Sequence, residues 1–137
     1  MNIFKQIKAK IYKHEIAIIL SYLTTLSAVA FYITFKADKL TYYADSMSRL
    51  DIARKVIDSL HPGFTQFGNI WPPLPQMLMV PFIWNDYLWH SGIAGSLMSM
   101  PMFIIGGLYI YKTAKLLTKS VLGSFLGLSI YALNINI

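Results

Sequence analysis

The sequence predicts an all-α, polytopic membrane protein, and three observations support this fold class. First, 55% of the 137 residues are hydrophobic and 13% are charged, whereas soluble domains are about 45–50% apolar and about 25% charged. Second, three long runs contain no charged residue, namely 16–35, 93–111 and 120–137. Third, the basic residues are distributed unevenly between the segments that flank these runs.

Residues 16–35 predict the first transmembrane helix. This run of twenty residues lies between Glu15 and Lys36, and at about 1.5 Å rise per residue such a helix crosses the roughly 30 Å hydrocarbon layer. A signal peptide is the competing interpretation, because residues 1–15 form a basic head. The apolar part of a signal peptide is usually about 7–15 residues long, so a transmembrane helix is the better prediction.

The other two uncharged runs predict further spans. Residues 93–111 form the predicted second span, which contains small residues that favour close packing on neighbouring helices: Gly95, Ser96, Ser99, Gly106 and Gly107. Residues 120–137 form the predicted third span, which is expected to be truncated.

Charge asymmetry predicts the orientation in the cytoplasmic membrane. Residues 1–15 contain four lysines and one glutamate, residues 112–119 contain three lysines and no acid, and residues 36–92 contain five basic and five acidic residues. By the positive-inside rule, the N-terminus and the loop 112–119 are cytoplasmic and the loop 36–92 is outside. This asymmetry explains the net charge of +6, and no nucleic-acid partner is predicted. The absence of cysteine excludes disulfides and thiol chemistry.

The outside loop begins with a predicted amphipathic helix at residues 45–60, which is expected to lie along the membrane surface. Its apolar residues recur at spacings of three and four, and the sequence HPG at 61–63 ends it. The apolar stripe consists of Leu50, Ala53, Ile57 and Leu60. Three charge pairs at four-residue spacing are predicted: Asp45–Arg49, Asp51–Lys55 and Arg54–Asp58.

The second half of the outside loop contains WPPLP at 71–75. Prolines remove amide donors and stiffen the backbone, so residues 69–82 are expected to stay out of the hydrocarbon core and to line a groove beside Asp45. Residues 76–83 predict a second short juxtamembrane helix. An aromatic belt with a re-entrant kink explains the same composition and remains an alternative. The three single histidines predict no metal site.

The order of these motifs resembles the start of the GT-C superfamily of integral-membrane glycosyltransferases. The resemblance is carried by YYADSMSRLDIAR at 42–54, by WPPLP and by ALNIN at 132–136. Within this superfamily, the chain resembles the branch that includes the protein O-mannosyltransferases and the lipid A aminoarabinose transferases. The chain departs from the family at Ser46, where a second acid is common, and it has three predicted spans where members have eleven or more. A 137-residue N-terminal piece is therefore expected to be inactive alone.

The resemblance implies an inverting sugar transfer from a polyprenyl-phosphate donor to a protein, lipid or glycan acceptor outside the membrane. It assigns the catalytic base to Asp45 and substrate binding to Arg49, Trp71, Pro72 and Pro73. A helix N-cap is the alternative role of Asp45. No cofactor or metal ligand is assigned, and a requirement for a divalent metal is left open.

Two other classes of function remain open at this stage. A small non-catalytic membrane subunit or anchor is consistent with the predicted size. A transporter fragment would have broken helices near the bilayer midplane, whereas the broken segment here is predicted at the outer surface.

Overall fold

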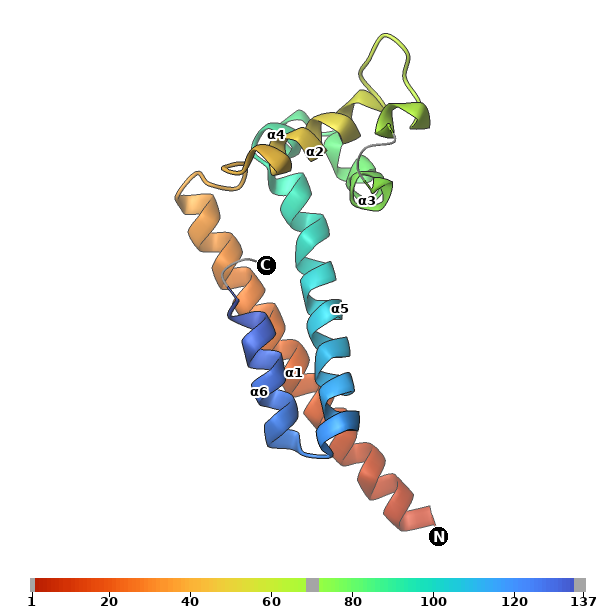
Figure 1. Ribbon diagram of the computed structural model, residues 1–137, viewed down its shortest axis with the longest axis vertical. Coiled ribbons are helices and arrows are strands. Elements are labelled where there is room, and N and C mark those ends of the chain that lie inside the picture. Colours follow the sequence, from red (N-terminus) through yellow and green to blue (C-terminus); the bar gives the residue numbers. More distant parts are fainter. Residues whose placement is uncertain (1, 69–71, 135–137) are drawn as a thin grey trace. The chain divides into compact units, whose positions relative to one another are not determined.

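The computed structural model describes residues 2–68 and 72–134, and every regular element within them is a helix (Figure 1). The predicted all-α class is therefore confirmed. In chain order the elements are α1 Asn2–Lys36, α2 Ala44–Lys55, the 3₁₀ helix η1 Phe64–Phe67, α3 Pro73–Ile83, α4 Asp86–His90, α5 Ile93–Thr118 and α6 Val121–Ala132.

Two of the described helices are long and apolar enough to cross a membrane. They are the 23 residues of α1 from His14 to Lys36 and the 26 residues of α5. Helix α6 has 12 residues, which at about 1.5 Å per residue is well short of the roughly 30 Å hydrocarbon layer. The predicted third span is therefore represented by a shorter helix, and residues 135–137 of that run lie outside the described part.

Helix α5 is longer than the predicted second span. The prediction ended the span at residue 111 and placed a loop at 112–119, but α5 continues to Thr118. The added segment KTAKLLT contains lysine, alanine and leucine, which are good helix formers. Lys119 directly follows the helix, and its φ of 52° is in the left-handed region, which is common just after a helix end.

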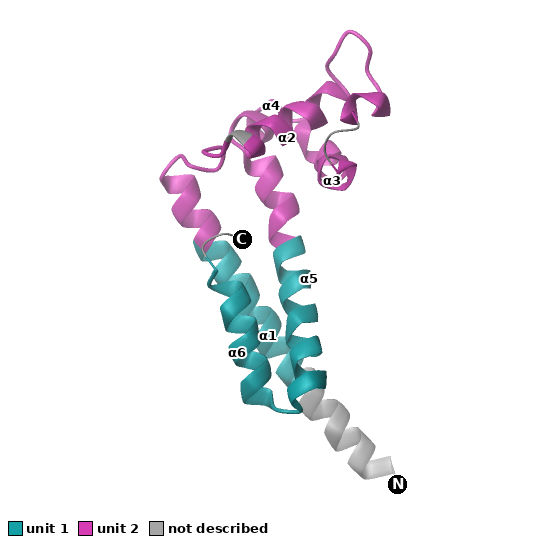
Figure 2. Cartoon of the chain, viewed as in Figure 1, with its two compact units in different colours: residues 1–29, 102–137 teal, residues 30–101 magenta. Residues whose placement is uncertain are grey.

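The chain divides into two compact units (Figure 2). Unit 1 consists of residues 1–29 and 102–137, and unit 2 consists of residues 30–101. Each unit has its own buried apolar cluster, so the two are described separately.

Unit 1 is formed by α6 with parts of α1 and α5. Its buried core consists of Ile19, Leu23, Tyr111 and Leu128. Gly107 allows α5 to approach α1 closely, because a Cβ at this position would lie 2.8 Å from Leu23 Cδ2. This glycine shows that a small residue of the second span lies at a helix contact, as the sequence predicted.

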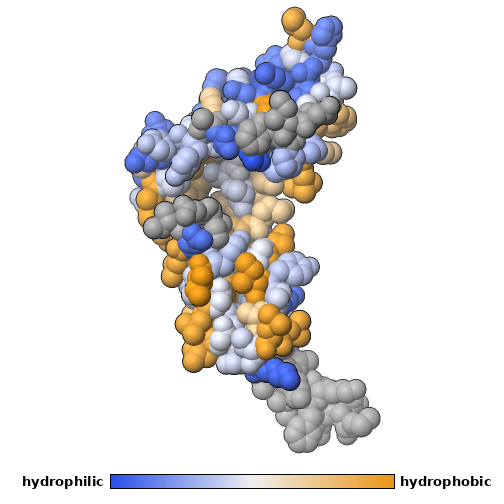
Figure 3. Space-filling view, in the orientation of Figure 1, coloured by the Kyte–Doolittle hydropathy of each residue, from blue (hydrophilic) through white to orange (hydrophobic). Residues whose placement is uncertain are grey.

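Large apolar side chains remain exposed on unit 1, and Figure 3 shows part of this apolar surface. Ile18, Leu116, Leu117, Leu122 and Ile130 are each at least 65% exposed. Soluble monomers rarely expose contiguous apolar patches larger than a few hundred Å². Such a surface is what a membrane helix presents to hydrocarbon.

Unit 2 joins α2 to α3 and to the start of α5. Leu50 and Ala53 of α2 are buried with Met79 and Ile83 of α3 and with Ala94. The apolar face predicted for the amphipathic helix is therefore confirmed at Leu50 and Ala53, where other parts of unit 2 cover it.

The predicted length of the amphipathic helix was wrong. Helix α2 ends at Lys55, before the HPG sequence, because the chain turns back and the Gly63 N–H donates a hydrogen bond of 2.9 Å to Val56 O. Leu60 lies beyond the helix and is 96% exposed, so it does not belong to the apolar stripe.

Candidate functional site

The candidate site lies in the segment that links the two spans, at residues 37–92. Helix α2 begins at Ala44 with Tyr43 as its N-cap, and the Tyr43 side chain makes no capping hydrogen bond. The Ser46 hydroxyl instead donates a hydrogen bond of 2.6 Å to Tyr43 O. The first turn of α2 therefore forms without a side-chain acceptor at the N-cap.

Asp45 is the second residue of α2, and its side chain is exposed. Since the N-cap is Tyr43, the alternative role of Asp45 as an N-cap is wrong. Within the described residues, its carboxylate takes part in no hydrogen bond or ion pair. Asp45 is therefore an accessible acid in the first turn of α2.

Arg49 follows Asp45 by one turn and is half-buried. The predicted ion pair between the two is not formed among the described residues, and neither is the pair Asp51–Lys55. The remaining predicted pair, Arg54–Asp58, is present with an N–O distance of 3.3 Å.

The prolines begin a helix. Pro72 is the N-cap of α3 and Pro73 is its first residue, while Pro75 is in the first turn. The first amides of a helix have no intrahelical acceptor, so proline costs little there and its fixed φ suits the helix start. The predicted helix 76–83 therefore begins three residues earlier and contains Pro81 in its last turn.

Pro72 and Pro73 are exposed, and Trp71 lies outside the described residues. Helix α3 packs against α2 through the buried residues Leu50, Met79 and Ile83. This packing brings together the helix that bears Asp45 and the helix that the prolines begin. The groove predicted beside Asp45 stays a prediction.

An arginine-centred cluster was only partly predicted. The Arg54 guanidinium donates to Ile83 O at 2.6 Å and is 2.7 Å from an Asp86 carboxylate oxygen. It also lies 4.8 Å from the centroid of the Trp89 ring. One side chain of α2 thus holds the C-terminal end of α3 and the start of α4.

The sequence signals for this cluster differ in strength. The Arg54–Asp58 pair follows from four-residue spacing. Asn85 caps α4 by accepting a hydrogen bond of 3.2 Å from the Leu88 N–H, and the Asn-Asp pair at 85–86 is a typical helix start. The contacts of Arg54 with Ile83 and Asp86 join residues about thirty positions apart, which no local pattern indicates.

The described part of unit 2 also contains buried polar atoms that have no hydrogen-bond partner. Among the described residues, these are both amide atoms of Gln76, the Ser59 hydroxyl and the Trp89 indole N–H. Gln76 is 0% exposed and lies on α3 one turn before Met79. A buried polar group without a hydrogen bond costs about 1–3 kcal/mol, so Gln76 destabilises this unit, and sequence reasoning missed it.

The described residues contain no group of three metal-ligating side chains. The chain matches no protein-family model, no curated protein and no solved structure. The functional interpretation therefore depends on the motifs and on the geometry given above.

Proposed function

We propose that this chain is the N-terminal part of a membrane glycosyltransferase of the GT-C type, which transfers a sugar from a polyprenyl-phosphate donor to an acceptor outside the cytoplasmic membrane. The observation that carries the proposal is the order of features between the two spans. An exposed carboxylate, which has no ion-pair or hydrogen-bond partner among the described residues, lies in the first turn of α2, and a proline pair then begins α3. This order is the one by which the chain resembles the family.

The proposed reaction is a single inverting displacement at the anomeric carbon of the sugar. The Asp45 carboxylate accepts the proton of the acceptor hydroxyl as the acceptor oxygen forms a bond to the anomeric carbon. The bond between that carbon and the lipid phosphate breaks at the same time, and the phosphate leaves with the electron pair. The exposed position leaves the carboxylate accessible to an acceptor hydroxyl, and a general base typically contributes about 10²–10⁴-fold to a rate.

Arg49 is proposed to bind the phosphate of the donor. A guanidinium matches the geometry of phosphate oxygens and stays charged at all relevant pH values. One wall of the substrate groove is proposed to consist of Trp71, Pro72 and Pro73. The two prolines stiffen this wall, because Pro72 is the N-cap of α3 and Pro73 is its first residue.

The test compares two variants of the full reading frame, Asp45→Asn and Asp38→Asn, in membranes supplied with a labelled polyprenyl-phosphate sugar. The control removes the same charge from the same segment. It is also structurally mild, because Asp38 is exposed with φ of 54° and asparagine tolerates this conformation well. We expect Asp45→Asn to lower transfer by about 10²–10⁴-fold and Asp38→Asn to leave it nearly unchanged.

Equal transfer by Asp45→Asn and the native protein would remove Asp45 from the chemistry. No transfer by the native protein from any donor would favour the alternative, a small non-catalytic membrane subunit or anchor. Both variants must be inserted at native levels, which is checked by their amount in the membrane fraction.

A further inference from the structure

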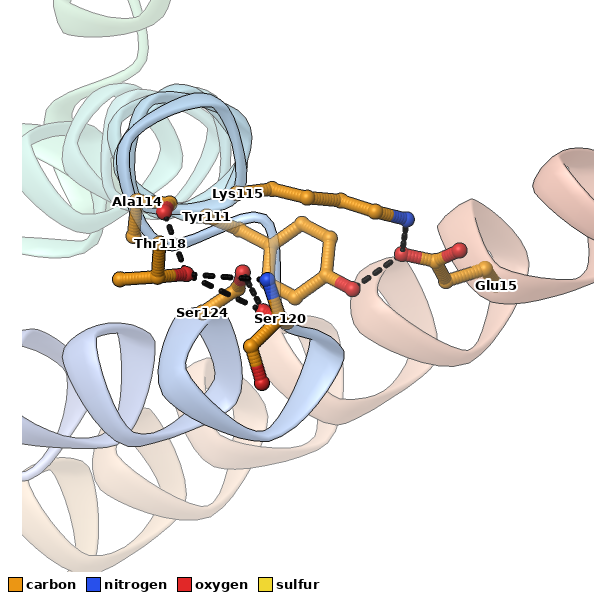
Figure 4. Close-up of polar contacts among 7 residues, drawn as sticks. All are labelled: Glu15, Tyr111, Ala114, Lys115, Thr118, Ser120 and Ser124. Carbon is orange, nitrogen blue, oxygen red and sulfur yellow. Dashed lines mark hydrogen bonds and ion pairs between the residues drawn. The ribbon is translucent and has the colours of Figure 1, made fainter.

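Buried polar side chains of unit 1 find their partners within the protein (Figure 4). The Tyr111 hydroxyl and the Lys115 ammonium both donate a hydrogen bond to Oε1 of Glu15. The Ser124 hydroxyl donates to Ser120 O. Tyr111 and Ser124 are buried, as is usual for polar groups that are hydrogen-bonded. These contacts join helices or close a helix turn, so they are structural.

Gln76 in unit 2 is buried without such partners. It is 0% exposed, and neither its amide nitrogen nor its amide oxygen has a hydrogen-bond partner among the described residues. The side chain therefore keeps both donor and acceptor capacity, at a cost to the stability of unit 2. Departures from the rule that buried polar groups are paired are expected at functional sites.

Gln76 lies in the part of α3 that the proposed site uses. Pro72 and Pro73 precede it by four and three residues, a spacing that places side chains on the same face of a helix. Side chains of a helix lean toward its N-terminus, so that of Gln76 leans toward the prolines. One turn further along, Met79 is buried with Leu50 of α2. Gln76 therefore lies between the proline pair and the contact of α3 with the helix that bears the proposed base.

We propose, on the basis of the sugar transfer proposed above, that Gln76 is a substrate-binding residue whose amide forms hydrogen bonds with a hydroxyl group of the donor sugar. A sugar hydroxyl can both donate and accept, as the two unpaired amide atoms require. Asp45 is assigned to the acceptor hydroxyl and Arg49 to the phosphate, so the hydroxyls that remain for Gln76 are those of the donor sugar. Because the amide is covered in the structure, the sugar displaces the covering side chains as it binds.

The variant Gln76→Met distinguishes a binding role from a structural one. Methionine has a similar volume and no unpaired amide, so unit 2 should become more stable while transfer becomes weaker. We expect kcat/KM for the donor to fall about 10-fold, the contribution of a typical hydrogen bond. Unfolding cannot cause this loss in a stabilised variant. Gln66→Met is the matched control, because the Gln66 amide donates a hydrogen bond of 2.7 Å to His61 O, and it should leave transfer unchanged.

Donor analogues test whether the partner is a sugar hydroxyl. Membranes with the full reading frame are supplied with polyprenyl phosphate that carries either the sugar transferred by the native protein or one of its monodeoxy analogues. One analogue should lower kcat/KM of the native protein about 10-fold. The same analogue should cause no further loss in Gln76→Met, because both changes remove the same hydrogen bonds.

Two results would overturn the role of Gln76. One is native transfer by Gln76→Met or an equal loss in Gln66→Met, and the other is equal sensitivity of Gln76→Met and the native protein to every monodeoxy donor. A buried water would then be the partner of the amide. Asp45→Asn, measured in parallel, separates the two proposals. If it loses transfer while Gln76→Met retains it, sugar transfer stands and only the role of Gln76 fails, whereas no transfer by the native protein would overturn both.

Discussion

At the scale of single residues, Arg54 joins three helices of unit 2, namely α2, α3 and α4. Its side chain is 16% exposed, and it bonds the last residue of α3 and an acid of α4. The carbonyl of Ile83 is one of the four at a helix end that lack an intrahelical donor. A cation at this position satisfies the carbonyl and interacts favourably with the negative end of the helix dipole.

Arg54→Ala is therefore expected to destabilise unit 2 by about 2 kcal/mol. A hydrogen bond that involves a charged group contributes about 1.5–3 kcal/mol, while the pair with the largely exposed Asp86 adds less than about 1 kcal/mol because solvent screens it. Unfolding can be followed by tryptophan fluorescence, since all three tryptophans lie in residues 30–101. The control is Lys55→Ala, at the neighbouring exposed residue. Equal losses of stability in the two variants would contradict the role given to Arg54.

Gln76→Met is expected to stabilise unit 2 by about 1 kcal/mol, because it removes a buried amide that has no hydrogen-bond partner in the described part of the chain and keeps a similar volume. The same fluorescence measurement in denaturant tests this. Gln66→Met is the matched control, because the Gln66 amide donates a hydrogen bond of 2.7 Å to His61 O. A loss of stability in Gln76→Met would show that the amide has a partner in the folded protein.

At the scale of elements, local patterns predicted the helices better than their ends. The charge-free run predicted the α1 span because length and apolarity alone decide such a helix. The end of α2 was wrong by five residues, because the turn that closes on Val56 O depends on a contact that periodicity does not indicate. The prolines at 72, 73 and 75 were expected to stiffen the backbone before a helix at 76–83, whereas they occupy the start of α3, where missing amides cost little.

The candidate site was predictable to a similar degree. The sequence placed Asp45 near the start of a helix, and the structure has it there, one position beyond the first helical residue. It did not predict that Tyr43 is the N-cap, because capping preferences favour small polar residues. The remaining contacts of the segment, above all those of Arg54, join distant residues and require the tertiary structure.

Close helix packing in unit 1 predicts a contrast between two glycines. Gly107→Ala should destabilise unit 1, because its new Cβ would lie 2.8 Å from Leu23, which is 0% exposed and has little space to move. Gly127→Ala should stabilise it by up to about 1 kcal/mol through helix propensity, because its Cβ would meet Ala114 at an ordinary 3.5 Å. Loss of helical circular dichroism in increasing sodium dodecyl sulfate measures both, and equal stability of the two variants would contradict this packing.

At the scale of the whole molecule, charge asymmetry predicts the orientation. The chain contains no cysteine, so single cysteines can be introduced without interference. In intact cells, a membrane-impermeant maleimide should label Ser48→Cys, an exposed position of α2. It should label Lys5→Cys only after permeabilisation. The reverse pattern would place α2 in the cytoplasm and would exclude sugar transfer on the outer side.

The most direct measurement of the central claim is the fate of the sugar on a polyprenyl-phosphate donor, in membranes that contain the full reading frame. The native protein is expected to release polyprenyl phosphate and to attach the sugar to an acceptor with inverted anomeric configuration. Membranes with Asp45→Asn are expected to retain the label on the lipid. Label that stays on the lipid with the native protein, or that reaches the acceptor equally well with Asp45→Asn, would contradict the account.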